Sequence, residues 1–431
     1  MKKTLLILLF LFAGYSIQAK VINVSEFGVY PNTFQDVTES VKKAIKECKN
    51  NPGSTLVFPK GRYDFWDTNA ERRKYFVSNT SSETDCPSKV KSIGLLFEGI
   101  KDVTVEGNGS QFIFHGKMIT FAVDQSENIT IQNVSVDFER PSMTEFTFDE
   151  LSSNHALITV HPDSKYTVID GRIRFYGEGW GMNDNFFSIQ TDTLQGTNVY
   201  SSWDPIGNSQ ATEIAPFKLK LENNFSNENY QEGQTLTTRC HIRDHVGVFV
   251  NRSKNVKLEN MYLHYMHGLG IVSQFSENLN YEKVHIVPSR GRTIAAFADG
   301  MHFSGCKGHV EIEDCNFKGL HDDPINVHGT YLRIEKIHSP NVVTMRFMHG
   351  QTYGMDAFFK NDTVAFIQSE TLRKIGFSTV EETERISDRQ IKVQLSKPLP
   401  KGIQEGDCLE NLTWTPSLHI SGCRMEMTCI I

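Results

Sequence analysis

A short pattern of apolar positions recurs along the chain, with apolar pairs at alternate positions separated by two residues of any kind. Copies led by Ser-x-Asn begin at Ser126, Ser253 and Ser276, and copies without that lead begin at Val310 and Leu418. Apolar residues at every second position are typical of strands. A repeat of such strands, roughly 20–30 residues long, predicts stacked coils, because one coil cannot bury its inner face alone.

The repeat predicts an all-β fold, a right-handed parallel β-helix interrupted by two inserted small β-barrel-like modules. Asn255 and Asn278 occupy the same place in successive copies and lie 23 residues apart, which sets the coil period. Asparagine suits the corners of such coils because it tolerates left-handed backbone. A leucine-rich repeat is the alternative, and it is disfavoured because its leucine spacing and helical segment are missing.

The N-terminal part of the β-helix is expected to be capped. Residues 36–49 have the apolar spacing of an amphipathic helix, with Asp36 and Glu39 placed to form a capping box. Such a helix would cover the open end of the first coil, whose backbone groups would otherwise be unpaired.

Two long segments break the repeat, and each contains an alternating strand followed by Gln-Glu-Gly, at Gln231 and at Gln404. Both leave the β-helix after comparable strands, so we expect them to project from one face and frame a cleft. The predicted organisation is a signal peptide (1–19), N-terminal cap and first coils (20–139), module 1 (140–245), central coils with the catalytic site (246–329), module 2 (330–411) and the start of a further coil, interpreted as truncated (412–431).

The first residues read as a secretory signal peptide. Lys2 and Lys3 precede the apolar run 5–13, which is too short to span a bilayer. We therefore expect export to a bacterial periplasm, to the cell surface or to the medium. No other stretch is long enough for a transmembrane helix, so no membrane span is predicted.

Composition narrows the classes further. A chain of 431 residues with 39% hydrophobic and 22% charged residues is neither disordered nor a polytopic membrane protein. Removal of residues 1–19 leaves 42 basic against 51 acidic residues, a net charge of -9, which argues against nucleic-acid binding. The eight cysteines are scattered without a CxxC pair, so a cysteine zinc site is not expected.

Three carboxylates carry the candidate chemistry. Asp299 and Asp322 are 23 residues apart, the coil period, so we expect them to stack on adjacent coils, with Asp323 beside them. Crowded carboxylates repel one another and tend to keep one of them protonated near neutrality. A protonated acid beside an ionised one is what glycosidic bond cleavage requires.

Less specific readings of the triplet remain open. Asp-Asp-Pro could be a polar turn, and stacked carboxylates could bind calcium. The EF-hand pattern and a fourth acidic ligand are missing, so no metal site is predicted. Residues proposed to bind substrate around the acids are His302, His321, His328, Arg290, Arg292, His264 and Trp203.

At the segments Ala-Asp-Gly-Met-His-Phe (298–303) and His-Asp-Asp-Pro-Ile-Asn-Val-His-Gly (321–329) the chain resembles glycoside hydrolase family 110, the exo-acting α-1,3-galactosidases. The resemblance implies removal of terminal α-1,3-linked galactose from glycans, including blood-group-B type glycans, with inversion and without a cofactor. It also implies that Asp299, Asp322 and Asp323 are the catalytic carboxylates. We assign Asp322 as general acid, with Asp299 and Asp323 activating water.

Two alternatives are kept. A polygalacturonase-like inverting hydrolase of uronate polysaccharides would pair the same acids, but its Gly-His-Gly and Arg-x-Lys motifs are missing and a negative chain disfavours a polyanionic substrate. A non-catalytic glycan-binding β-helix would not need three crowded carboxylates. The sequence leaves the oligomeric state open.

Overall fold

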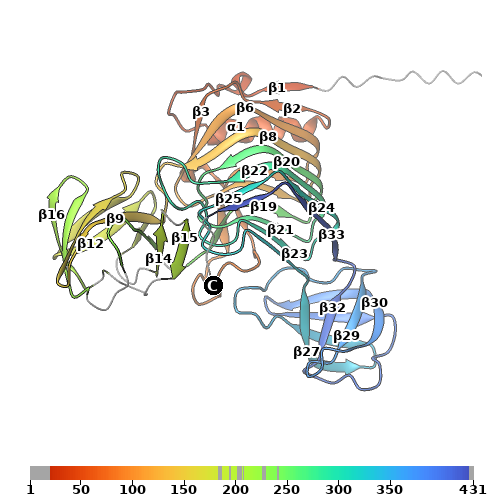
Figure 1. The fold of residues 1–431 in the computed structure, drawn as a ribbon. Helices are drawn as coiled ribbons and strands as arrows, with labels where there is room; N and C mark the ends of the chain where they lie inside the picture. Colours follow the sequence, from red (N-terminus) through yellow and green to blue (C-terminus); the bar gives the residue numbers. More distant parts are fainter. Residues whose placement is uncertain are drawn as a thin grey trace, which may run out of the picture.

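The computed structural model describes residues 20–182, 187–193, 196–200, 206, 208–225, 230–239 and 242–426. The predicted signal peptide and Trp203 therefore lie outside the described residues. A β-helix forms the body of the molecule, with one module to its left and the other at its lower right (Figure 1). In the described ranges, no helix has the length and apolar character needed to cross a membrane.

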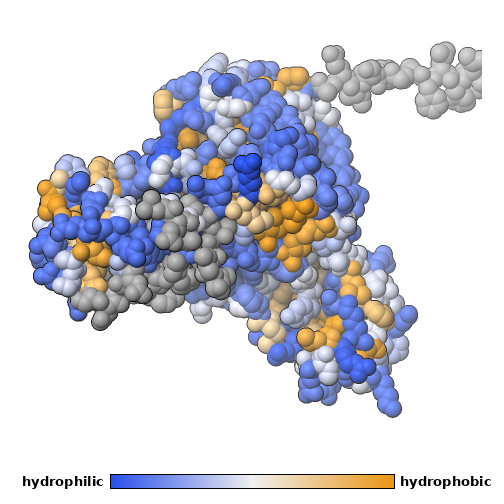
Figure 2. Space-filling view, in the orientation of Figure 1, coloured by the Kyte–Doolittle hydropathy of each residue, from blue (hydrophilic) through white to orange (hydrophobic). Residues whose placement is uncertain are grey.

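Two long sheets make up the β-helix, and in both the successive coils pair in parallel. The first sheet consists of β1 (Val21–Asn23), β2 (Thr55–Val57), β3 (Arg62–Trp66), β6 (Lys101–His115), β8 (Glu127–Phe138), β20 (Lys254–Leu263), β22 (Glu277–Ile286), β24 (Lys307–Glu313), β25 (Asn316–Lys318), β33 (Pro416–Ser421) and β34 (Arg424–Glu426). Its pairing of Lys254 with Glu277 confirms the predicted 23-residue coil. Apolar side chains gather over the end of this sheet, where β33 is the last long strand (Figure 2).

The second sheet faces the first across the core and is parallel except at its antiparallel edge strand β4. Its strands are β4 (Glu71–Lys74), β5 (Val90–Glu98), β7 (Ile119–Asp124), β19 (His245–Asn251), β21 (Gly268–Gln274), β23 (Met301–Ser304) and β26 (Ile325–His328). Side chains from both sheets, such as Leu258, Ile271 and Met301, are fully buried between them. The alternating apolar pattern thus forms one continuous column.

The Ser-x-Asn lead of the repeat has a structural reason. The Ser253 hydroxyl donates to the Val123 carbonyl of the coil below, and the Ser253 amide donates to the Ser276 hydroxyl of the coil above. Two residues on, Asn255 adopts a left-handed backbone (φ 54°) and its amide group donates to Asn128. The corner that carries the Ser-x-Asn lead is therefore bonded to the same corner of the neighbouring coils, through a column of serines and a column of asparagines.

Helix α1 (Thr38–Asn50) packs its apolar face against the first coils, as expected for the cap. In the part of the chain that the structure describes, the remaining helical turns are the short 3-10 segments η1 (Val24–Phe27) and η2 (Asp67–Asn69). The predicted capping box is wrong, because the helix begins after Val37. Asp36 instead accepts from the Thr38 amide, and Glu39 pairs with Lys42 at 2.6 Å.

Module 1 is an antiparallel unit built around its own apolar core. Its seven-stranded sheet runs β15 (Thr197–Tyr200), β14 (Phe187–Asp192), β18 (Thr235–Arg239), β9 (Thr144–Leu151), β10 (His155–Val160), β17 (Lys218–Glu222) and β16 (Gln210–Ala215), and a smaller sheet holds β11 (Lys165–Ile169), β12 (Arg172–Gly177) and β13 (Trp180–Met182). Ile129 of β8 nevertheless lies opposite Val256 of β20, so the insertion leaves the coil register intact.

Module 2 is a closed antiparallel barrel with a separate core. Its strands are β27 (Tyr331–Ser339), β28 (Val342–Arg346), β29 (Thr363–Ile367), β30 (Lys374–Ser387), β31 (Gln390–Leu395) and β32 (Cys408–Asn411). The chain then returns as β33, which places Leu418 opposite Val310.

Buried charges fasten module 1 to the loop between β22 and β23. The Arg292 guanidinium bonds both carboxylate oxygens of Asp137, at 2.6 and 2.8 Å, and lies 3.3 Å from Asp163 of module 1. The Arg292 side chain is only 2% exposed. Glu145 of β9 accepts the Thr293 amide at 2.9 Å, and burial raises the pKa of its carboxyl. Arg292 is thus held in a structural ion pair.

We expect Arg292→Gln to lower the free energy of unfolding by about 3–5 kcal/mol, because it leaves the buried Asp137 carboxylate without its partner. Urea denaturation of the full chain measures this. Arg290→Gln is the matched control: Arg290 is exposed and lies 3.6 Å from Asp163, so a change within about 0.5 kcal/mol is expected. Equal effects of the two substitutions would contradict the docking role.

The asparagine column is expected to contribute to the stability of the β-helix. Asn255→Ala should cost about 2 kcal/mol of unfolding free energy, because it removes two side-chain hydrogen bonds and puts alanine, which tolerates a left-handed backbone less well than asparagine, at positive φ. Asn255→Gly keeps the backbone conformation and loses only the hydrogen bonds, so it should cost about half as much. Thermal unfolding of both variants separates the hydrogen-bond contribution from the backbone contribution. If Asn255→Gly is less stable than Asn255→Ala, the backbone contribution is refuted.

Candidate active site

The three predicted carboxylates do come together, at the corner where the chain enters β23 and β26. The pairing differs from the expected one. Met301 lies opposite Ile325 and the Gly300 amide donates to the Asp323 carbonyl, so Asp299 lies opposite Asp323 and not opposite Asp322. The prediction failed because this coil has 24 residues, one more than the 23-residue coil between β20 and β22 from which the period was taken.

Asp299 is buried, with 4% of its surface exposed. Its Oδ2 atom lies 2.6 Å from Nδ1 of His302, whose side chain has no exposed surface. Burying a carboxylate is costly unless it is paired and hydrogen-bonded, and His302 supplies that partner. His302 therefore contacts the candidate catalytic residue Asp299, and its buried side chain is not accessible to a ligand.

Asp322 is half-buried beside Asp299. Burial raises the pKa of the Asp322 carboxyl, the negative charge of Asp299 raises it further, and Asp323 adds a smaller effect in the same direction. The Arg243 guanidinium, 3.7 Å from Oδ2 of Asp322, acts in the opposite sense. The net direction is upward, which favours a protonated carboxylic acid at this position.

Asp323 differs from its two neighbours in being exposed. Its Oδ2 accepts a hydrogen bond from the Asn326 side chain at 3.3 Å, and its amide donates to Oδ1 of Asp322. The site thus holds one buried carboxylate with a histidine partner, one half-buried carboxyl with a raised pKa, and one solvated carboxylate.

Arg243 is a site residue that the sequence reading missed. It precedes β19, at the point where the chain returns from module 1, and its guanidinium also donates to Gln351 of module 2 at 3.0 Å. In the sequence, the only feature that could have indicated Arg243 as a site residue is its position directly after the inserted module 1. Arg243 links Asp322 to module 2.

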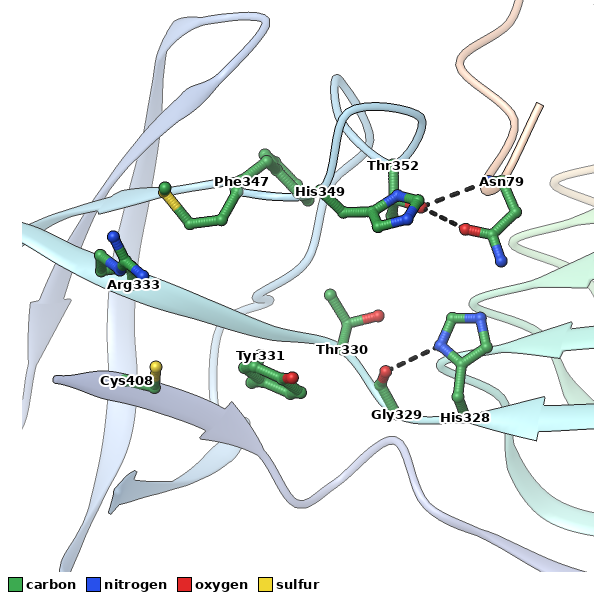
Figure 3. A pocket seen from close by; sticks show the side chains of 11 residues that line it. Asn79, His328, Gly329, Thr330, Tyr331, Arg333, Phe347, His349, Thr352 and Cys408 are labelled. Carbon is green, nitrogen blue, oxygen red and sulfur yellow. Dashed lines mark hydrogen bonds between the residues drawn. The ribbon is translucent and has the colours of Figure 1, made fainter. Parts of the chain in front are cut away.

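His328 lines a cavity of about 410 Å³ between the β-helix and module 2 (Figure 3). Its Nδ1 lies 2.9 Å from the Gly329 carbonyl, and burial lowers the pKa of its imidazole. Across the cavity, His349 of module 2 lies near the hydrogen-bonded pair of Asn79 and Thr352 (Figure 3). The predicted His328 is therefore next to an open space large enough for a sugar.

The other predicted substrate-binding residues in the described part of the chain do not line this cavity. His321 is buried, and burial lowers the pKa of its imidazole well below the usual value. The His264 ring lies 2.9 Å from the Val287 carbonyl, packs against Tyr262 and contacts none of the three acids. Arg292 is held in the buried ion pair described above, whereas the exposed Arg290 is beside Asp163.

Both modules contribute side chains that bond to residues near this corner. From module 1, the Asn198 side chain donates to the Leu320 carbonyl, just before the Asp322 loop. From module 2, Gln351 accepts from Arg243. Among the described residues, no group of three His, Cys, Asp or Glu side chains has an arrangement suited to a metal ion. The arrangement is suited to proton transfer by carboxylates.

Both modules match described domain families. Residues 145–236 match the family model of GLAA-B β-barrel domain I, and residues 342–409 match that of GLAA-B β-barrel domain II. A solved structure, the family 28 exopolygalacturonase of Yersinia enterocolitica, aligns with 74% of this chain and 46% of its own length at 12% identity and a TM-score of 0.33. That likeness is too slight to bear on function.

Sequence relatives extend over nearly the whole chain. It is 43% identical to α-1,3-galactosidase A of Bacteroides fragilis, over 99% of this chain and 72% of that protein. It is 37% identical to α-1,3-galactosidase B of Bacteroides thetaiotaomicron, over 98% of this chain and 69% of that protein. With its three clustered carboxylates and its two inserted modules, the chain belongs to the α-1,3-galactosidases of glycoside hydrolase family 110.

Proposed function

We propose that this chain is an exo-acting α-1,3-galactosidase that hydrolyses terminal α-1,3-linked galactose, including that of blood-group-B type glycans, with inversion at the anomeric carbon. The observation that carries the proposal is the half-buried Asp322, whose pKa is raised beside the buried Asp299. The names of the relatives support the linkage.

The geometry divides the catalytic roles. Asp322 is suited to general acid catalysis, because its protonated form is favoured and can donate its proton to the leaving glycosidic oxygen. Asp299 is the candidate base, because His302 compensates its charge in a buried position. Asp323, solvated and bound by Asn326, can hold the attacking water between the two.

In a single displacement, water attacks the anomeric carbon from the face opposite the leaving oxygen. The water loses one proton to the base while the acid loses one proton to the departing sugar, so the charge of the pair is unchanged over the reaction. The proposal requires no covalent sugar–enzyme intermediate.

The stereochemical outcome tests inversion. Proton NMR of the full chain acting on galactosyl-α-1,3-galactose should show β-galactose first, with the α-anomer appearing only through mutarotation. The blood-group-B trisaccharide should also release galactose, whereas an α-1,4-linked galactoside should react far more slowly. Initial appearance of the α-anomer would refute inversion, and equal rates on both linkages would refute the linkage assignment.

Asp322→Asn tests the general acid. The amide cannot protonate a leaving alcohol, so kcat on the α-1,3-linked disaccharide should fall roughly 10²–10⁴-fold. A p-nitrophenyl α-galactoside has a leaving group that needs little protonation, so the loss on that substrate should be much smaller. Asp314→Asn, an exposed change on the same β-helix, is the control and should leave both rates unchanged.

The pH dependence of the same reaction has a defined sign. The active form of Asp322 is the protonated one, so kcat should fall as the pH rises through its pKa. Because that pKa is raised, activity should persist to higher pH than an exposed aspartic acid would allow. The Asn variant should lose this alkaline limb, and an unchanged alkaline limb would exclude Asp322 as the acid.

A further inference from the structure

A chain of hydrogen bonds runs from Asp299 to the cavity wall. Oδ2 of Asp299 lies 2.6 Å from Nδ1 of His302, and Nε2 of His302 lies 2.8 Å from Nε2 of His328. At the far end, Nδ1 of His328 lies 2.9 Å from the Gly329 carbonyl oxygen. The two rings meet at a steep angle of 73° with their centroids 4.8 Å apart.

Each of the three hydrogen bonds between these groups needs a proton. The Gly329 carbonyl can only accept, so Nδ1 of His328 must carry a proton. A second proton must lie between Asp299 and Nδ1 of His302, and a third between the two Nε2 atoms. An ionised carboxylate and two neutral imidazoles supply only two protons. The three hydrogen bonds therefore require one additional proton on Asp299, His302 or His328.

Rotating either ring by 180° about χ2 does not remove the requirement. A flip of His302 would place a carbon against the Asp299 oxygen, and a flip of His328 would place a carbon against the Gly329 carbonyl. Either flip would also put a carbon in place of Nε2 between the two rings, and the fully buried His302 would lose a hydrogen bond there, which is costly. These ring orientations are therefore the ones that keep all three hydrogen bonds.

We propose that the extra proton resides on His302, so that a buried imidazolium keeps Asp299 ionised beside the protonated Asp322. The inference rests on the proposed function and deepens it: His302 is a positioning residue that acts through Asp299. An imidazole binds a proton more tightly than a carboxylate by roughly 2.5 pKa units in water, which places the proton on the ring. The short Asp299–His302 contact fits a charge-assisted hydrogen bond.

The surrounding charges agree with this placement. Asp322 and Asp323, on the loop before β26, are the acids that neighbour Asp299. On the other side, His349 of module 2 acts on His328 to lower the pKa of its imidazole, and Arg243 acts on His349 in the same way. The acids thus lie at the His302 end of the hydrogen-bonded chain and His349 lies at the His328 end, while Arg243 acts on both Asp322 and His349.

His302 would then separate the roles of two adjacent carboxyls. Without its positive charge, one proton would have to be shared between Asp299 and Asp322, as in a carboxylate dyad. With it, Asp299 stays ionised without solvent, and its negative charge in turn favours the protonated form of Asp322. Asp299 as base and Asp322 as acid can thus coexist at one corner of the β-helix.

Nitrogen-15 NMR of the full chain, labelled in its histidine rings, tests the protonation directly. At about pH 8, where an ordinary histidine is neutral, His302 should keep protons on both ring nitrogens. His302→Gln should remove that signal, and His264→Gln, a partly buried histidine away from the acids, should not. A neutral His302 would overturn the proposal.

A second measurement needs no variant. In the wild-type protein, the two Nε2 nitrogens should show scalar coupling through their shared proton, and absence of that coupling would also overturn the proposal. Neither readout depends on turnover. A wild-type protein that shows the imidazolium but releases no galactose would therefore refute the proposed function and leave the proton count standing.

The pH profile of His302→Gln separates a positioning role from a merely structural one. The acidic limb of kcat/KM should move to higher pH, because Asp299 ionises less readily without the cation. The alkaline limb should move to lower pH, because Asp322 loses the neighbouring negative charge over part of the range. A variant with reduced activity but unmoved limbs would show that His302 only supports the fold.

Discussion

Parallel pairing of the backbone between successive coils is the interaction on which the rest of this structure depends. Ile129 lies opposite Val256, and Val310 lies opposite Leu418, although a whole module separates the members of each pair along the chain. Because the modules leave and return at corners, the ladder hydrogen bonds continue beneath them. The modules can therefore be placed against the catalytic corner without disturbing the core.

The same pairing creates the electrostatic problem of the site. Neighbouring coils are about 4.8 Å apart, so Asp323 is stacked on Asp299 and Asp322 is next to both. Three carboxylates this close cannot all be ionised at no cost. Each one meets the constraint differently: Asp299 has a histidine partner, Asp323 is solvated, and Asp322 is half-buried with a raised pKa. The catalytic roles proposed for the three carboxylates follow from these different environments.

Much of the architecture was predictable because it depends on a repeat. The Ser-x-Asn lead reports the serine and asparagine columns, and the 23-residue spacing is the real coil length between β20 and β22. The offset at the site was not predictable in this way, because the spacing of Asp299 and Asp322 equals that coil length although the local coil has 24 residues. Corners absorb an extra residue without altering the strand pattern.

Residues that act through tertiary contacts were the hardest to assign. Arg290 and Arg292 are neighbours in one short motif, yet one is exposed and the other is buried against Asp137. Conversely, Arg243 and Gln351 belong to no motif and meet only because both modules return to the same corner. The sequence pattern predicts the inner face of a coil well, because the apolar residues on that face recur at regular spacing. The outer faces have no such spacing.

Several parts of the chain contact the loop that holds Asp322. Asn198 of module 1 binds the Leu320 carbonyl before the Asp322 loop, while Arg243 spans from Asp322 to Gln351 of module 2. Burial is the largest cause of the raised pKa of Asp322, and an open corner of the β-helix would not supply it. A coil ladder can align the carboxylates, and the inserted modules add contacts around the one whose pKa burial raises.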